Sequence, residues 1–121
     1  MPRTAESLGK AGEKAALRFI KSHGYKPLVR NFSARGGEVD IIALDGDTIC
    51  FVEVRTRSSD SFASPEATVG RRKQARIRSA ASTYLKKHHM QDRRCRFDLV
   101  AILAGGDSDD EWQIELIQGA F

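Results

Sequence analysis

An Asp-Gly pair between two strand-like runs constrains this chain more than any other feature. Residues 37–44 and 48–55 are rich in Val, Ile and Phe, and Asp45-Gly46 lies between them. Apolar runs on both sides of such a pair are the strongest short-range signal for a β-hairpin. We therefore expect two adjacent antiparallel strands in the middle of the fold.

Charged side chains inside both predicted strands make this hairpin unusual. Side chains alternate along a strand, which predicts one shared face for Glu38 and Asp40, and one for Glu53 and Arg55. The turn length decides whether these faces coincide. A two-residue turn sets Glu53 opposite Glu38, and a four-residue loop sets Glu53 opposite Asp40. Either even-length loop gathers all four side chains on one face, whereas a three-residue loop separates them.

Carboxylates crowded on one face of a sheet repel each other and are costly to desolvate, so the pattern predicts a bound cation or a basic partner. Diagonal neighbours on two strands lie roughly 7–8 Å apart, within reach of one shared metal ion. The alternative interpretation is a cross-strand ion-pair network with no chemistry. In both cases the hairpin is the place to look for a functional site.

Composition limits the class of protein but not its activity. The 121 residues suffice for one domain, residues 1–121, with its own core. The chain contains no apolar run near the roughly 20 residues of a membrane span. Its amino terminus lacks the apolar stretch of a signal peptide, so we expect a cytoplasmic protein without a membrane partner. Cys50 and Cys95 are isolated in sequence, and we expect both to be reduced, in or near the core.

Charge is distributed unevenly. The net charge is only +4, but residues 55–96 are strongly basic. A positive field beside a carboxylate cluster favours a polyanionic substrate.

Helical periodicity predicts two main helices, from about Thr4 to His23 and from Pro65 or Glu66 to about His89. Glu13 borders the apolar stripe of the first helix. It is either an acid favoured by the helix dipole or an acid that points into the carboxylate site. Lys73 lies on the core-facing stripe of the second helix, where a lysine must reach solvent or find carboxylates.

The remaining segments complete the predicted order α-β-β-β-α-β-β. The basic side chains of the second helix are either a solvated face or a phosphate-contacting one. The other predicted elements are a strand at 25–32, a turn at 33–37, a polar loop at 56–65, a closing strand pair at 96–103 and 112–117, and a solvated acidic loop at 105–111.

This order resembles the restriction-endonuclease-like, PD-(D/E)xK core. The resemblance implies an α/β fold with a mixed central sheet of about five strands flanked by two helices. Four motifs resemble the YraN-like family of small bacterial proteins: Gly-Glu-Val-Asp-Ile-Ile (37–42), Phe-Val-Glu-Val-Arg-Thr-Arg (51–57), Ala-Ser-Thr-Tyr-Leu (81–85) and Arg-Phe-Asp-Leu-Val-Ala-Ile (96–102). The layout is also similar to that of archaeal Holliday-junction resolvases.

The resemblance implies metal-assisted phosphodiester hydrolysis. Asp40 and Glu53 correspond to ligands of Mg²⁺ or Mn²⁺, with Glu13 as the helix acid and Glu38 helping directly or through water. Arg55 stands where the family of sites has a catalytic lysine. An arginine keeps the charge but cannot shuttle a proton. Lys73 is a candidate for the missing ammonium group.

Three functions follow as alternatives. The first is a metal-dependent endonuclease or exonuclease, acting on branched or flapped DNA. The second is a nucleic-acid-binding module whose active site no longer works, and the third is an adaptor for a recombination or repair protein. A junction-cutting enzyme needs two sites related by symmetry, which would make it a homodimer. The basic residues expected to contact nucleic acid are Arg35, Arg57, Arg71, Arg72 and Arg76.

Overall fold

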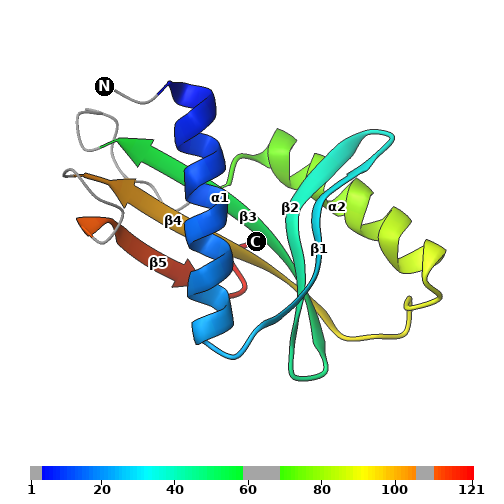
Figure 1. Cartoon of the computed structure of the whole chain (residues 1–121). Coiled ribbons are helices and arrows are strands. Elements are labelled where there is room, and N and C mark those ends of the chain that lie inside the picture. Colours follow the sequence, from blue (N-terminus) through cyan, green and yellow to red (C-terminus); the bar gives the residue numbers. More distant parts are fainter. Residues whose placement is uncertain (1–3, 59–68, 106–110) are drawn as a thin grey trace.

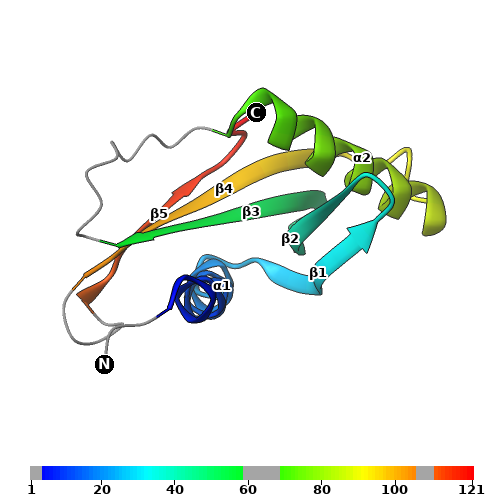
Figure 2. The same cartoon turned by 90° about the horizontal axis from the view of Figure 1, so that it is seen from above.

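Five strands form one mixed sheet with a helix on each face (Figures 1 and 2). The computed structural model describes residues 4–58, 69–105 and 111–121. In chain order the elements are α1 (Ala5–Ser22), β1 (Lys26–Ala34), β2 (Gly37–Asp45), β3 (Thr48–Ser58), α2 (Arg71–Lys87), β4 (Cys95–Ala104) and β5 (Gln113–Ile117). This confirms the predicted α-β-β-β-α-β-β layout.

The strand order in the sheet is β1-β2-β3-β4-β5. β3 and β4 run parallel, and the other neighbours are antiparallel. A parallel pair needs a crossover connection, and here α2 lies in the segment that joins β3 to β4. No helix among the described residues is both long and apolar enough to cross a membrane.

Each helix buries one apolar stripe against its own face of the sheet, as Figure 2 shows from above. On the α1 face the stripe Ala15, Ala16 and Ile20 packs with β2 and β3 residues such as Ile41 and Val52. On the α2 face the buried side chains of the helix and sheet include Ile77, Ala80, Tyr84, Ile42 and Phe51. Both stripes agree with the helical periodicity of the sequence.

α1 lies unusually close to the sheet because of one glycine. A Cβ at Gly12 would collide with Thr56 of β3. At the amino-terminal end of the helix the Ser7 backbone N–H donates to the Thr4 hydroxyl at 3.0 Å, which is an N-cap bond. The cap and the glycine together fix both where α1 begins and how near its residue 13 comes to the strands.

Several predicted boundaries were wrong. β1 extends to Ala34 and β2 begins at Gly37, so the expected five-residue turn is only Arg35-Gly36, with Gly36 at a φ of +93° that suits glycine. β3 continues to Ser58, since its pairing with β4 also continues to that residue. The rest of the expected loop, and most of the acidic loop, lie outside the described residues.

α2 begins at Arg71, later than the predicted Pro65 or Glu66. Val69 is buried and Gly70 is extended, and the Gln74 side chain donates to the Val69 carbonyl at 2.6 Å. Val69 is therefore held by packing and by a side chain of the helix, outside the helix itself, and the exposed Gly70 is its N-cap residue. The expectation for Cys50 is confirmed because it is buried, but Cys95 is exposed, since it is the first residue of β4.

Candidate active site

The β2–β3 register brings two predicted site residues together. Asp45 pairs with Thr48, so the turn is Gly46-Asp47, one residue later than expected. The resulting register is that of the four-residue alternative, which sets Asp40 opposite Glu53. The ladder ends at the Ile41–Val52 pair, just before the two acids.

The Asp40 carboxylate accepts a hydrogen bond from the β3 backbone at the point where the β2–β3 pairing ends. The backbone N–H of Val54 donates to Asp40 Oδ2 at 2.8 Å, which fixes the carboxylate against β3. The regular alternation of β2 is interrupted here, because Val39 and Ile42, three residues apart, both pack on the α2 face. Glu38 is exposed and is not among the residues that line the pocket with Asp40, although its charge, like that of Asp40, acts on Glu13.

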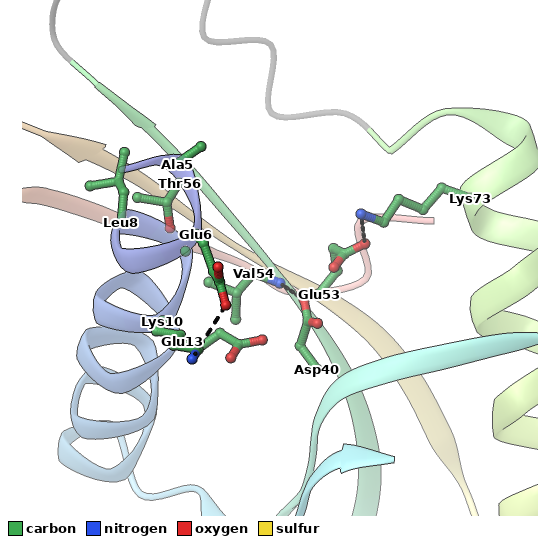
Figure 3. A pocket seen from close by; sticks show the side chains of 11 residues that line it. Ala5, Glu6, Leu8, Lys10, Glu13, Asp40, Glu53, Val54, Thr56 and Lys73 are labelled. Carbon is green, nitrogen blue, oxygen red and sulfur yellow. Dashed lines mark hydrogen bonds and ion pairs between the residues drawn. The ribbon is translucent and has the colours of Figure 1, made fainter. Parts of the chain in front are cut away.

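A pocket lined by residues of both helices contains four acids and two lysines, of which three acids and one lysine were predicted as site residues (Figure 3). Glu13 comes from α1, Asp40 from β2, Glu53 from β3 and Lys73 from the first turn of α2. Figure 3 shows the Glu13 side chain directed from the helix toward Asp40, and Lys73 reaching down to Glu53. The complete lining is Ala5, Glu6, Leu8, Gly9, Lys10, Glu13, Asp40, Glu53, Val54, Thr56 and Lys73.

Glu53 is the most perturbed acid in this pocket. It is only 4% exposed, and burial followed by contact with the Asp40 carboxylate raises its pKa to about 8. Lys73 Nζ lies 3.0 Å from Glu53 Oε2 and opposes this rise. Apart from this ion pair, Oε2 has no polar partner with hydrogen-bond geometry among the described residues.

Glu13 faces the same cluster from the other side. Burial and the neighbouring Asp40 carboxylate raise its pKa, while the charge of Arg30 opposes this rise. Of the two interpretations of Glu13, the geometry therefore agrees with an acid that points into the site. Lys73 meets both expectations for a lysine on an apolar stripe, because its ammonium group reaches the Glu53 carboxylate while 59% of the side chain stays exposed to solvent.

The pocket offers two carboxylates of the kind that hard divalent cations bind, which is fewer than a complete protein ligand set. Within the three described segments no group of three or more His, Cys, Asp or Glu side chains could hold a metal ion. Mg²⁺ commonly binds through one or two carboxylates and keeps several waters. Asp40 and Glu53 form such a pair, and Glu53 Oε2, which has only the Lys73 ion pair, could accept a cation as a further partner.

The predicted arginines lie outside this pocket. Arg55 is half-buried on β3, where it pairs with Ala101 of β4. Arg57 is half-buried further along the same strand, and Arg35 is exposed in the β1–β2 turn. The exposed side chains at the start of α2 are Arg71, Arg72 and Arg76. None of the five arginines predicted to contact nucleic acid lines the carboxylate pocket.

A second buried acid, Asp98 on β4, was not predicted. Asp98 accepts hydrogen bonds from Tyr25 Oη at 2.7 Å, Arg96 Nε at 2.8 Å and the Gly119 N–H at 3.0 Å. Arg96 also donates to Asp45 at 2.8 Å. The available signal was an acid within the apolar run at 97–103, where a buried strand is expected to lack charge.

Comparisons with known proteins identify relatives along almost the whole chain. The sequence model of the uncharacterised protein family UPF0102 matches residues 12–102. A UPF0102 protein of Geobacter metallireducens is 46% identical over 116 residues, covering 96% of this chain and 93% of the relative. One from Moorella thermoacetica is 41% identical over 122 residues, covering 100% of both chains.

Proposed function

We propose that this chain, which belongs to the uncharacterised protein family UPF0102, is a metal-dependent nuclease. Membership of UPF0102 confirms the resemblance to the YraN-like family found in the sequence motifs. One observation carries the nuclease proposal: Asp40 and Glu53 converge beside a lysine ammonium group, and Glu53 Oε2 is buried without a hydrogen-bond partner. Buried polar atoms are normally satisfied, so a buried carboxylate oxygen whose one polar neighbour is an exposed lysine has room for a further ligand.

Asp40 and Glu53 would hold Mg²⁺ or Mn²⁺, with water and a substrate phosphate completing the ligands. When bound, the cation would polarise the scissile phosphate and lower the pKa of a bound water. The chain's own contribution is to hold the carboxylates in place. The Val54 N–H orients Asp40, and burial of Glu53 keeps competing water from its oxygens.

Lys73 takes the role that the resemblance assigns to the position of Arg55. Its ammonium group lies 3.0 Å from Glu53, and its exposed side chain leaves room for a phosphate oxygen beside the same nitrogen. Arg55 lies outside the pocket lining. We therefore propose that Lys73 stabilises the charge that develops on the phosphate.

Glu13 is suited to proton transfer. It faces the pocket from α1, and its raised pKa brings it closer to neutral pH than an exposed glutamate. A carboxylate with such a pKa can accept a proton from the attacking water and release it afterwards.

A binding module without cleavage is the second candidate. It is favoured by Arg55 at the lysine position and by the lack of a three-ligand cluster among the described residues. This candidate keeps the nucleic-acid partner and predicts no strand scission.

End-labelled branched, flapped, single-stranded and duplex DNA, incubated with Mg²⁺ or Mn²⁺, test the proposal. Asp40→Asn should abolish cleavage, whereas Asp47→Asn, the same change in the exposed β2–β3 turn, should leave it intact. Lys73→Ala should lower the rate roughly 10²–10³-fold, as loss of a charge-stabilising group does. Arg55→Ala should have a smaller effect.

Cleavage that persists in Asp40→Asn would come from a contaminant and refute the proposal. Binding of DNA without cleavage by the unaltered chain would support the binding module.

A further inference from the structure

A second pocket lies between α1 and β1, and it shares Lys10 and Glu13 with the carboxylate pocket. Its lining contains three cations and one acid: Lys10, Ala11, Glu13, Lys14, Arg30 and Asn31. We propose that this pocket is a phosphate-binding subsite, which holds the phosphodiester backbone of a nucleic-acid strand next to the carboxylate site. The role of the neighbouring site as a catalytic centre rests on the proposed function.

Two of the three cations around this pocket have no ion pair. Within the described part of the chain, neither Lys14 nor Arg30 forms an ion pair. Lys10 and Lys14 lie one turn apart on α1, where like charges repel each other. Arg30 adds a third positive charge from β1. An anion bound among the three would relieve this repulsion.

Lys10 is available to such an anion at little cost. Its nitrogen lies 3.5 Å from Glu6, but both side chains are about four-fifths exposed, at 78% and 82%. Exposed ion pairs of this kind contribute little to stability. Lys10 can therefore leave Glu6 and bind a phosphate oxygen with little loss of free energy.

Glu13 connects the two pockets. Its carboxyl group faces Asp40 on one side and is influenced by the charge of Arg30 on the other. From Lys73, which contacts Glu53, the acids continue through Asp40 to Glu13, and Glu13 also lines the pocket that contains the cations Lys10, Lys14 and Arg30. This is the order expected for a polyanion that crosses a cation-loaded carboxylate centre and is held on both sides of it.

The backbone of β1 changes direction at this pocket. Asn31 has a φ of +53° within the strand, and Val29 and Phe32, three residues apart, both pack on the α2 face. A left-handed residue is unusual inside a strand, although asparagine tolerates the conformation. The irregularity leaves Arg30 and Asn31 at the pocket, where the carboxamide offers a further donor.

This subsite differs from the expected contact surface on α2. Arg71, Arg72 and Arg76 lie on an exposed helix face and line neither pocket. The α1–β1 pocket is concave and continuous with the acids. A strand bound there would be positioned relative to the scissile phosphate, whereas contacts on α2 would add affinity without fixing the reacting bond.

The test is binding of fluorescently labelled single-stranded and flapped DNA, and of the equivalent RNA, in Ca²⁺ at several salt concentrations. The variant carries Lys14→Gln and Arg30→Gln. The matched control carries Lys86→Gln and Lys87→Gln, which removes the same charge from exposed positions in the last turn of α2. All four side chains are exposed, so folding should be unchanged.

The Lys14/Arg30 variant should bind roughly tenfold more weakly, and its slope of log K against log salt should fall by about 1.5, as loss of two phosphate contacts requires. The control should stay within about twofold of the unaltered chain, because only non-specific attraction is reduced. The DNA and RNA arms show which strand chemistry the subsite accepts.

Equal binding by the two double variants refutes the subsite, even if cleavage depends on Asp40. Weaker binding in the Lys14/Arg30 variant alone supports the subsite, even if the unaltered chain cleaves nothing and the nuclease fails. A chain that binds neither DNA nor RNA refutes both.

Discussion

Replacement of Glu53 by glutamine is expected to stabilise the folded protein, by an amount that grows as the pH rises. Glutamine keeps the size of the side chain and removes the charge. Glu53 is 4% exposed, lies against the Asp40 carboxylate, and has a buried oxygen without a hydrogen-bond partner in the described structure. Its ionised form is therefore the costly one, even with Lys73 beside it.

The sign and size follow from the pKa. The folded chain holds the Glu53 proton up to about pH 8, whereas the ordinary value is 4.5. Between these values the unfolded chain binds fewer protons than the folded one, so stability falls as the pH rises, by about 1.4 kcal/mol per unit. Across the whole interval the loss is about 5 kcal/mol. Below the lower value both states are protonated and this contribution to stability is fully present.

Urea unfolding between about pH 4 and pH 9, in chelator, measures the effect. The difference between Glu53→Gln and the unaltered chain should widen with pH and level off above about pH 8. Glu115→Gln, the same change on an exposed β5 position, should run parallel to the unaltered chain. If the Glu53→Gln curve also runs parallel, the buried ionisation that we infer is absent.

Three further outcomes are expected. At about pH 8, Mg²⁺ should raise the thermal unfolding temperature of the unaltered chain but not that of Glu53→Gln, because the metal binds only the folded chain with an ionised carboxylate. Equal shifts in the two proteins would argue against a metal at Glu53. Gly12→Ala should cost about 1–3 kcal/mol in urea unfolding because its Cβ meets Thr56, whereas Gly9→Ala, with open space around it, should gain up to about 1 kcal/mol; similar values would refute the close approach of α1. Burial raises the pKa of Asp98, but bonds from Arg96 and Gly119 outweigh it and lower the pKa, so the stability that this acid provides is lost as the pH falls. Asp98→Asn should therefore make the free energy of unfolding depend less on pH in the acid range, and an unchanged dependence would contradict this.

The sequence predicted the ends of those elements whose boundaries depend on side chains adjacent in sequence. α1 begins after Thr4, whose hydroxyl caps the helix, and both features are visible in the sequence. The start of α2 was missed because Gly70 has no side-chain cap, so packing of Val69 rather than capping chemistry sets the boundary. The ends of β1 and β3 depend on their partner strands in the same way.

The acids of the site were predictable, but their arrangement was not. Period-two alternation identified Asp40 and Glu53, and a lysine on an apolar stripe identified Lys73. The register was left open between two even-length turns, because the Asp45–Thr48 pair that decides it is a backbone feature. The break in alternation lies between Asp40 and Ile41, so it separates Asp40 from the following residues of β2 and not from Glu38, which stays outside the pocket because it is exposed.

The contrast between Glu53 and Asp98 is the strongest argument against a purely structural network at the carboxylate site. They are the two buried charged side chains in the described part of the chain, and they lie on adjacent strands. Asp98 has bonds to both oxygens and a lowered pKa, which is how a fold accommodates a buried acid for stability. Glu53 has one ion pair, to the largely exposed Lys73, no bond with hydrogen-bond geometry to Oε2, an acid as its neighbour and a raised pKa. A fold that satisfies one buried acid so fully would have no reason to leave the other incomplete, unless a ligand completes it.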